Sequence, residues 1–214
     1  MNAAMHCPLC DGRTIEPFFE DKRRPYLRCC RCALVFVPPA YYLDRSAERA
    51  EYDLHCNTLD DPGYRAFLSR LALPLVARLA PGSCGLDFGC GPGPALAAML
   101  REAGHEMSLY DSFYQPERSV LYRRYDFICA TEVVEHLHQP GMELSRLWSL
   151  LNPGGVLGIM TKLVLGSEAF AGWHYKNDPT HVCFFSEQTW HWWAREHGAG
   201  LEFIGADVML LQPR

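Results

Sequence analysis

Residues 86–93, which read Leu-Asp-Phe-Gly-Cys-Gly-Pro-Gly, constrain the fold of this chain more than any other stretch. Their first three residues end a short apolar run at 84–88, and the glycine turn precedes a helix-forming segment at 94–103, which stops at Gly104. Glycines in such a turn let the backbone bend sharply and approach a ligand, because no Cβ stands in the way. The following helix offers free N–H groups and the positive end of its dipole. This strand, turn and helix therefore predict the start of a ligand-binding α/β domain.

The rest of the chain continues this alternation of strand and helix patterns. Asp61-Pro62 is a good helix start, Pro74 is expected to kink that helix, and Pro81-Gly82 to end it. We expect strands at 84–88, 105–110, 126–130 and 156–161, helices at 94–103, 140–151 and 186–197, a turn at 152–155, and a hairpin of 201–204 with 208–211. Strands that alternate with helices predict a doubly wound, mostly parallel sheet, here with an antiparallel edge hairpin.

Three kinds of nucleotide site compete for the glycine turn. A P-loop ends in Gly-Lys-Ser/Thr, and the turn has no such ending. The dinucleotide fingerprint requires Gly or Ala at position 94, where this chain has Pro94. What remains is Asp-x-Gly-x-Gly-x-Gly, with Asp87 two places before Gly89. A carboxylate at that place can bind the ammonium of an amino-acid moiety. The alternative without a ligand is a glycine turn that serves only tight packing between the strand and the helix.

Three further motifs follow along the chain. Tyr110-Asp111 ends the second strand, residues 130–137 read Ala-Thr-Glu-Val-Val-Glu-His-Leu, and residues 151–155 read Leu-Asn-Pro-Gly-Gly. Over roughly residues 50–214 these motifs resemble the class I S-adenosylmethionine-dependent methyltransferases. The resemblance implies a Rossmann-like sheet, S-adenosylmethionine as the cofactor, and an acidic strand tip that accepts both ribose hydroxyls. It implies these cofactor-binding residues: Asp87, Phe88, Gly89, Cys90, Gly91, Gly93, Tyr110, Asp111, Thr131 and Glu132.

The segment between Asp111 and Tyr125 departs from that family. It has hardly enough residues for the helix and third strand that the family usually has there. We expect a third strand reduced to about residues 119–121. The acidic residue that often contacts adenine from that strand has no obvious counterpart.

Two C-x-x-C pairs, eighteen residues apart, lie near the N-terminus. Each pair can form one side of a tetrahedral zinc site, and the residues between them suffice for a hairpin. We expect a zinc ribbon-like module at 1–45, followed by the methyltransferase domain at 46–214; redox or metal-free cysteines are the alternative. Cys30 is expected to be a bystander, and His6 has the wrong offset. The expected structural zinc ligands are Cys7, Cys10, Cys29 and Cys32.

Composition and net charge limit the classes of partner that the chain is expected to bind. The net charge of −5 argues against long nucleic acid, and no apolar run is long enough to span a membrane. The N-terminus does not resemble a signal peptide, so the ten cysteines are interpreted as thiols in a reducing cytoplasm. A basic cluster at Lys22, Arg23, Arg24, Arg28 and Arg31 is interpreted as a solvated hairpin tip.

The acceptor side is expected at residues 173–186, an aromatic and histidine-rich stretch directly after the fifth strand. It resembles the W-x-Y-x-x-D-P-T-H-x-x-F-F-S segment of bacterial methyltransferases often described as quinol methylases. Trp173, Tyr175, Asp178 and His181 are the expected substrate residues, with His181 as general base. An equal alternative is that residues 178–180 form a turn and His181 only holds it in place.

Two other groups are weaker candidates. Glu135 and His136 follow the fourth strand near the donor, although the same pair can simply fix the start of a helix. Tyr52, His55 and Asn57 lie ahead of the first helix of the domain and are candidates for a lid over the donor; the alternative is an ordinary surface segment.

The sequence thus predicts an S-adenosylmethionine-dependent methyltransferase that acts on a small-molecule acceptor (a sugar, quinol or secondary metabolite) by in-line transfer. One alternative is a non-catalytic zinc-ribbon binding module on a methyltransferase-like scaffold. Another is an RNA or protein methyltransferase. The oligomeric state is left open.

Overall fold

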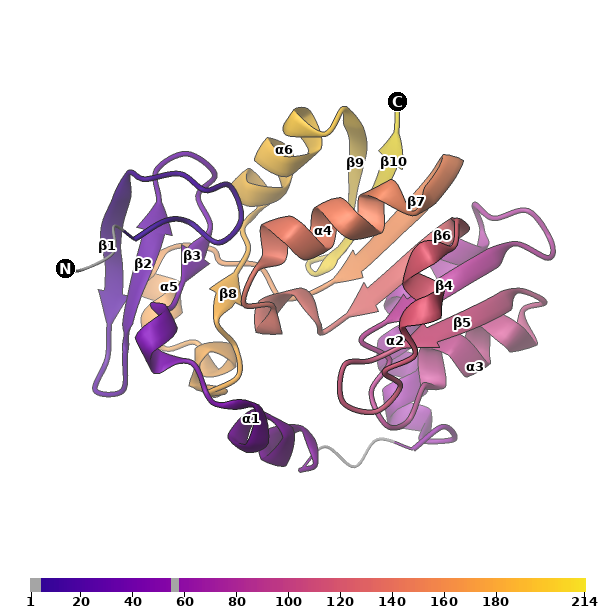
Figure 1. Cartoon of the computed structure of the whole chain (residues 1–214), viewed down its shortest axis with the longest axis horizontal. Coiled ribbons are helices and arrows are strands. Elements are labelled where there is room, and N and C mark those ends of the chain that lie inside the picture. Colours follow the sequence, from indigo (N-terminus) through magenta and orange to yellow (C-terminus); the bar gives the residue numbers. More distant parts are fainter. Residues whose placement is uncertain (1–4, 55–57) are drawn as a thin grey trace.

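The computed structural model describes residues 5–54 and 58–214. Their central feature is a six-stranded sheet with the order β5-β4-β6-β7-β10-β9 (Figure 1). Strand β4 is parallel to β5 and β6, β6 is parallel to β7, and β10 runs antiparallel to both β7 and β9. The bounds are β4 (Cys84–Phe88), β5 (Glu106–Tyr110), β6 (Tyr125–Thr131), β7 (Leu151–Met160), β9 (Ala199–Ile204) and β10 (Val208–Pro213). The expected doubly wound sheet with an antiparallel edge hairpin is confirmed.

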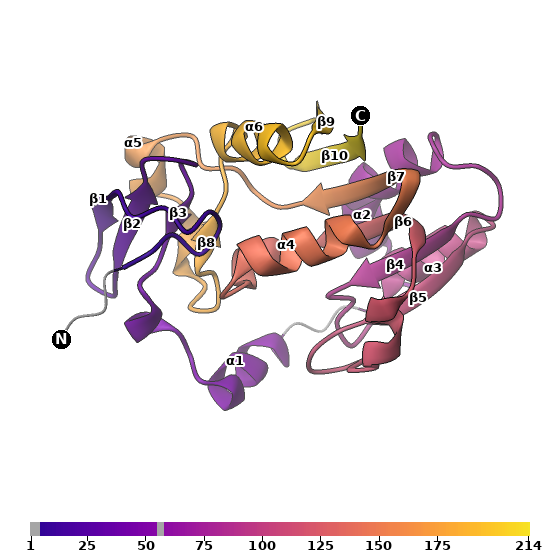
Figure 2. The same cartoon turned by 45° about the horizontal axis from the view of Figure 1, so that its top comes forward.

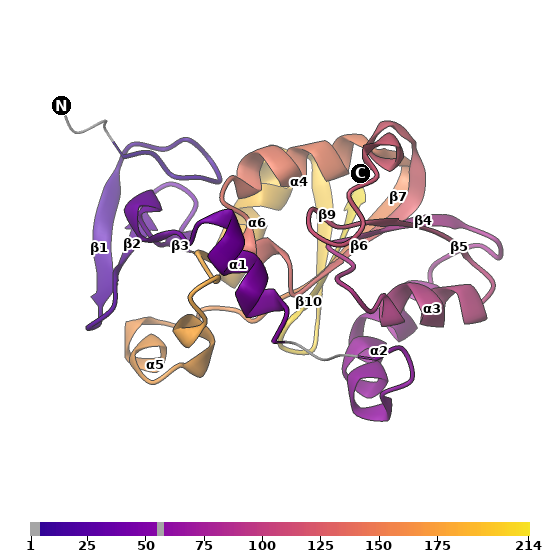
Figure 3. The same cartoon turned by 60° about the horizontal axis from the view of Figure 1, so that its bottom comes forward.

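Helices cover both faces of this sheet, as Figure 3 shows. Helices α2 (Pro62–Val76) and α3 (Ala95–Glu102) lie on one face, and α4 (Pro140–Ser149) and α6 (Glu187–Glu196) on the other. The two-residue period of a strand explains this arrangement, because successive side chains point to opposite faces. Within β6, Phe127 and Cys129 pack with α2 and α3, whereas Ile128 and Ala130 pack with α4 and α6.

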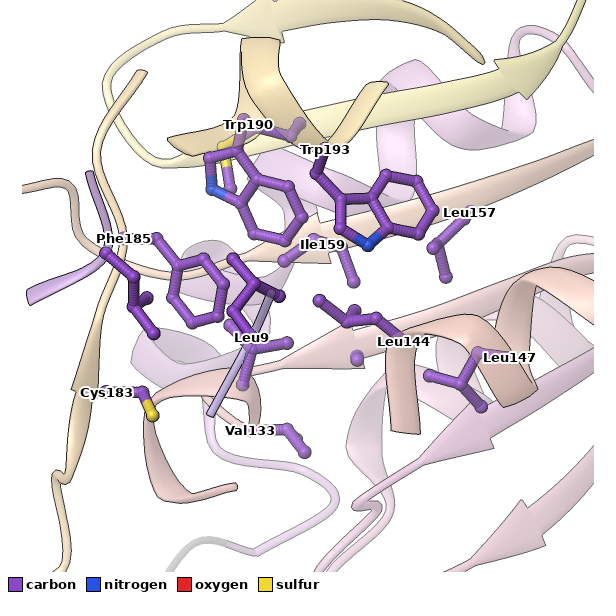
Figure 4. Packing of buried hydrophobic residues seen from close by; sticks show 14 of the residues in the cluster. Leu9, Val133, Leu144, Leu147, Leu157, Ile159, Cys183, Phe185, Trp190 and Trp193 are labelled. Atoms are coloured by element: carbon purple, nitrogen blue, oxygen red, sulfur yellow. The ribbon is translucent and has the colours of Figure 1, made fainter. Parts of the chain in front are cut away.

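The second face has an aromatic core. Trp190 and Trp193 of α6 pack over Leu144 and Leu147 of α4 and over β7 (Figure 4). Both indoles are buried, so the expectation that the late tryptophans are packing residues is confirmed.

Helix starts follow the capping residues of the sequence. Asp61 accepts a hydrogen bond from the Tyr64 N–H, and Ser186 caps α6 in the same way through Thr189. Helix α2 ends at Val76, one turn before the expected Pro81-Gly82 stop, because Pro74 lies in its last turn. Residues 152–155 are an irregular beginning of β7 instead of a separate turn.

The expected third strand at 119–121 is wrong. These residues lie in a 3₁₀ helix, η2 (Arg118–Tyr122), and β5 is the edge of the described sheet. The buried side chains of Val120 and Leu121 fix this helix, and the Tyr125 hydroxyl donates a hydrogen bond to the Val120 carbonyl at 2.8 Å.

The N-terminal module is a second, antiparallel sheet with the order β1-β2-β3-β8 (Figure 2). Strands β1 (Ile15–Glu20), β2 (Pro25–Cys29) and β3 (Val35–Phe36) come from the module, whereas β8 (Cys183–Phe184) comes from the far end of the chain. One hydrophobic core runs from Leu9 of the module to Trp190 of α6. The sheet and the core therefore both cross the expected division at residue 45.

Short elements connect the two sheets. Helix α1 is not among the elements that the sequence predicted, and Asp44 caps it by accepting from the N–H groups of Ser46 and Ala47. The bounds are η1 (Pro39–Tyr41), α1 (Arg45–Tyr52), η3 (Val134–His136), α5 (Ser167–Ala171) and η4 (His174–Asn177). None of the helices in residues 5–54 and 58–214 has the length and apolar character that a bilayer crossing requires.

Candidate active site

A cleft of about 760 Å³ opens at the carboxyl ends of β4, β5 and β6. This is the edge where open α/β sheets bind ligands. It is lined by the glycine turn, the tip of β5, the segment after β6 and one side of α1. Asp178 and His181, from the C-terminal part of the chain, also line the cleft.

Gly89 shows why the turn requires glycine. Its φ is +76°, and a Cβ at this position would lie 2.4 Å from Val133 Cγ2. The N–H groups of Gly89 and Cys90 donate to the Tyr110 carbonyl at 2.8 and 3.2 Å. The turn is thus hydrogen-bonded to the end of β5 and lies close to Val133, which follows β6.

Asp111 joins the glycine turn to the loop after β5. Its Oδ2 accepts from the Gly91 N–H at 3.0 Å, and its Oδ1 accepts from the N–H groups of Phe113 and Tyr114 at 2.8 and 3.1 Å. The carboxylate therefore lies at the cleft wall in a fixed orientation.

Asp87 is buried below the turn, with 2% of its surface exposed. Its Oδ1 has no hydrogen-bond partner among the described residues. Burial raises the pKa of this carboxyl to about 7. Buried carboxylate oxygens are rarely left unsatisfied, so a site for a donor or cation is implied beside Asp87. The ammonium of S-adenosylmethionine fits this requirement.

Two glutamates follow β6. Glu132 has a φ of +52°, rare for a side chain other than glycine or asparagine, and its buried Oε1 has no hydrogen-bond partner among the described residues. Glu135 is fully buried and accepts from Thr161 Oγ1 at 2.9 Å and from the Tyr175 hydroxyl. Burial raises the pKa of both glutamates, and for Glu135 the neighbouring Glu132 adds to the effect.

His181 is oriented by a backbone carbonyl. Its Nδ1 lies 2.7 Å from the Tyr175 oxygen, and because a carbonyl only accepts, Nδ1 carries the proton. The lone pair is then on Nε2, which lies 3.6 Å from Asp178 Oδ2. Asp178 also accepts from Thr180 within its turn. The turn at residues 178–180 is therefore capped by Asp178, and the His181 imidazole keeps a lone pair on Nε2.

The cleft includes most of the residues expected from the sequence. All ten expected cofactor-binding residues line it, as do Asp178, His181 and Tyr52. Trp173 and Tyr175 do not line it, because Tyr175 is buried with its hydroxyl on Glu135 and Trp173 packs against Phe170. His55 and Asn57 lie outside the described residues.

Helix α1 adds cleft residues that the sequence analysis missed. Arg45 and Glu48 line the cleft, and the Arg45 guanidinium lies 4.2 Å from the centre of the Phe113 ring. The capping Asp44, followed by charged residues, was the available signal.

Known proteins share this architecture. A family model described as a methyltransferase domain matches residues 63–203. The chain belongs to this family. The expectation of a class I S-adenosylmethionine-dependent methyltransferase is confirmed, and no curated protein sequence matches the chain.

Three solved structures illustrate the fold of this methyltransferase. Burkholderia thailandensis 1,6-didemethyltoxoflavin-N1-methyltransferase, with bound 1,6-didemethyltoxoflavin and S-adenosylhomocysteine, has 19% identity and a TM-score of 0.54 over 92% of this chain and 97% of that one. Streptomyces venezuelae DesVI has 17% identity and a TM-score of 0.52 over 81% and 100%. A complex of the Haloferax volcanii Trm112 methyltransferase activator with a methyltransferase has 11% identity and a TM-score of 0.51 over 80% and 100%. At these identities the likeness concerns the fold alone.

The N-terminal hairpin of the methyltransferase contacts the turn at residues 178–180. Arg24 is only 7% exposed, so the expectation that the whole basic cluster is solvated is wrong for this residue. Its guanidinium donates to the carbonyls of Lys176, Asp178 and Pro179 at 2.8 to 3.0 Å. Lys176 in turn contacts Asp21 at 3.0 Å. The hairpin thereby positions the turn that brings Asp178 to the cleft.

The four cysteines of the C-x-x-C pairs converge in the same module. The Sγ atoms of Cys7 and Cys32, and those of Cys10 and Cys29, lie 3.5 Å apart, and all four are within 4.8 Å of one another. A tetrahedral zinc site with Zn–S bonds of about 2.3 Å has sulfurs about 3.8 Å apart, so this set fits zinc. Cys30 is exposed and outside the cluster.

Proposed function

We propose that this methyltransferase transfers the methyl group of S-adenosylmethionine to a small-molecule acceptor that enters the cleft beside His181. The observation that carries the proposal is one continuous cleft that joins the glycine turn, with its buried Asp87, to Asp178 and His181. Its volume of about 760 Å³ is in the range of small-ligand sites. A sugar, a quinol or a secondary metabolite fits such a site.

At the donor end, each group has a defined part. Asp87 binds the ammonium of the methionine moiety, and Asp111 accepts from the ribose hydroxyls. The glycine turn allows the backbone to approach the ligand closely. The bound donor supplies a methyl group activated by a positively charged sulfur.

At the acceptor end, the protein aligns the acceptor and receives its proton. The imidazole Nε2 of His181 carries a lone pair, and Asp178 at 3.6 Å stabilises the imidazolium that forms when a proton arrives. Enclosure in the cleft holds the two reactants in line, which is a large part of catalysis in a displacement reaction.

The cysteine cluster has a structural part in this proposal. Cys7, Cys10, Cys29 and Cys32 bind one zinc ion, which folds a module with little core of its own. Through Arg24, that module holds the turn on which Asp178 lies.

Calorimetric titration with S-adenosylhomocysteine tests the donor site. We expect micromolar binding to the wild-type protein, and loss of that binding in Asp111→Ala. Asp60→Ala, an exposed aspartate outside the cleft, is the matched control and should bind as the wild type does. An absence of binding to folded, zinc-loaded wild-type protein would contradict the proposal and favour the non-catalytic alternative.

A further inference from the structure

A cluster of metal-ligand type lies at the acceptor end of the cleft. One ligand atom from each of Glu135, His136 and His181 lies within 4.8 Å of the others. The three residues come from two segments that are tied together: the Val182 N–H donates to the Glu135 carbonyl at 2.8 Å, and the Cys183 thiol to the Leu137 carbonyl at 3.3 Å. These hydrogen bonds therefore hold the two segments side by side at the cluster.

Hydrogen bonds from neighbouring residues also orient the side chains of Glu135 and His181. Thr161 and Tyr175 each donate a hydrogen bond to one oxygen of the Glu135 carboxylate. The Tyr175 carbonyl accepts from His181 Nδ1, which makes Nε2 the ligand-type nitrogen. Metal-binding histidines and carboxylates usually have such supporting partners, which set the tautomer and the ring orientation.

A fourth residue borders the cluster. The Oε2 atom of Glu132 lies 3.3 Å from the Tyr175 hydroxyl, and the same hydroxyl also contacts Glu135. Its Oε1 is buried with no hydrogen-bond partner among the described residues, and its backbone has a positive φ. A strained residue that brings a second carboxylate toward a first one favours a cation nearby.

We propose that Glu135, His136 and His181, with Glu132 beside them, bind one divalent cation that contacts the methyl acceptor. The inference rests on the proposed function, because Glu132, His136 and His181 line the cleft that it assigns to donor and acceptor. Mixed imidazole and carboxylate ligands suit divalent cations such as Mn²⁺, Fe²⁺, Co²⁺ or Zn²⁺. The softer thiolates of the four-cysteine cluster suit Mn²⁺ poorly.

The cation points to a hydroxylated acceptor. A hydroxyl bound to a divalent cation loses its proton more readily, and positions left open by the protein ligands can hold two adjacent oxygens, as in a vicinal diol or a catechol. The hydroxyl proton leaves to solvent. The oxygen then forms a bond to the methyl carbon as the sulfur–carbon bond breaks, which gives an ether and S-adenosylhomocysteine. In the cation-bound protein His181 is a ligand and accepts no proton; the cation lowers the pKa of the bound hydroxyl instead, so that the proton can leave to solvent.

Electron paramagnetic resonance of Mn²⁺ tests the site. The protein is first given one equivalent of Zn²⁺, which the four thiolates bind in preference. We expect the wild type to bind one Mn²⁺ per chain, and Glu135→Gln and His181→Gln to lose it. Thr161→Val removes only a supporting hydrogen bond and should weaken Mn²⁺ binding by about 10- to 100-fold. His191→Gln, an exposed histidine outside the cleft, is the matched control and should bind as the wild type does.

Two results would overturn the cation site: no Mn²⁺ bound by the folded wild type, or equal binding by the wild type and His181→Gln. Titration with S-adenosylhomocysteine on the same samples separates this failure from a failure of the proposed function. If S-adenosylhomocysteine binds where Mn²⁺ does not, the cation site is wrong and the donor site stands. If neither binds, the proposed function fails as well.

Discussion

At the scale of single residues, Gly89 shows how the donor site depends on the absence of one carbon atom. Gly89→Ala combines a positive φ with a Cβ 2.4 Å from Val133 Cγ2. We expect lower thermal stability and weaker S-adenosylhomocysteine binding, because the turn must move away from Val133. Gly82→Ala is the matched control: its φ is +75° but nothing lies within 4 Å of the added carbon, so it should cost only about 1–2 kcal/mol of backbone strain. Equal losses of stability in the two variants would contradict the packing argument.

Asp87 predicts how donor binding depends on pH. Burial raises the pKa of its carboxyl to about 7, so below that pH the group is increasingly neutral in the free protein and attracts an ammonium less. The affinity for S-adenosylhomocysteine should therefore rise with pH up to about 7, by at most about tenfold per unit, and then level off. Asp87→Asn should bind more weakly and lack this rise, as calorimetry between pH 5.5 and 8 would show; an unchanged pH profile would contradict the assignment.

Residues of the two ends of the cleft differed in how well the sequence predicted them. Asp87, Gly89 and Asp111 lie in local motifs at strand ends, and these motifs, with the family that they resemble, were enough to predict that all three line one cleft. Tyr175 and Arg24 could not, because what they contact is set by chain segments far away in sequence. An aromatic residue predicted as pocket lining thus supports Glu135 from behind, and an arginine predicted as solvated is buried.

At the scale of elements, the hairpin of β1 and β2 supports the turn at residues 178–180, on the side of the cleft proposed for the acceptor. Arg24→Lys keeps the charge but loses the fork that reaches three carbonyls. We expect a loss of about 2–3 kcal/mol in stability. Amide exchange at Thr180 and His181 should become faster, while S-adenosylhomocysteine affinity stays unchanged. Arg28→Lys, an exposed arginine on the same hairpin paired with Glu16, is the control and should change neither. Unchanged exchange in Arg24→Lys would show that the turn holds its shape without the hairpin.

Periodic elements were predictable, whereas short ones such as β8 and η2 were not. The strands and helices around the glycine turn have the periods and caps that the sequence displays. Strand β8 is only two residues long, and its pairing with β3 joins positions about 150 residues apart, so no local pattern could reveal it. The segment 118–122 has apolar residues that fit a strand equally well, and only their burial in the structure selects a 3₁₀ helix.

At the scale of the whole molecule, the zinc-ribbon-like module and the methyltransferase sheet share one core. Leu9 of the module belongs to the same buried cluster as Leu144, Trp190 and Trp193 (Figure 4). The Gly141 N–H at the start of α4 donates to the Pro8 carbonyl at 3.1 Å, and a Cβ at Gly141 would lie 2.3 Å from the Leu9 oxygen. A contact this close requires the first cysteine knuckle to keep its shape, so the two parts of the chain are coupled.

Loss of the cysteine cluster should therefore destabilise the entire chain. Zinc bound by four thiolates contributes about 10–16 kcal/mol to folding, comparable with the total stability of an ordinary domain, about 5–15 kcal/mol. In scanning calorimetry we expect one cooperative transition for the zinc-loaded protein, and a lower transition temperature, without a separate high-temperature peak, for Cys32→Ser or after chelation. Cys30→Ser changes an exposed thiol next to the cluster and should leave the transition in place. A second transition that keeps the wild-type temperature and still shifts with S-adenosylhomocysteine would mean that the methyltransferase sheet folds independently. In that case the shared core and the pairing of β3 with β8 would contribute little to its stability.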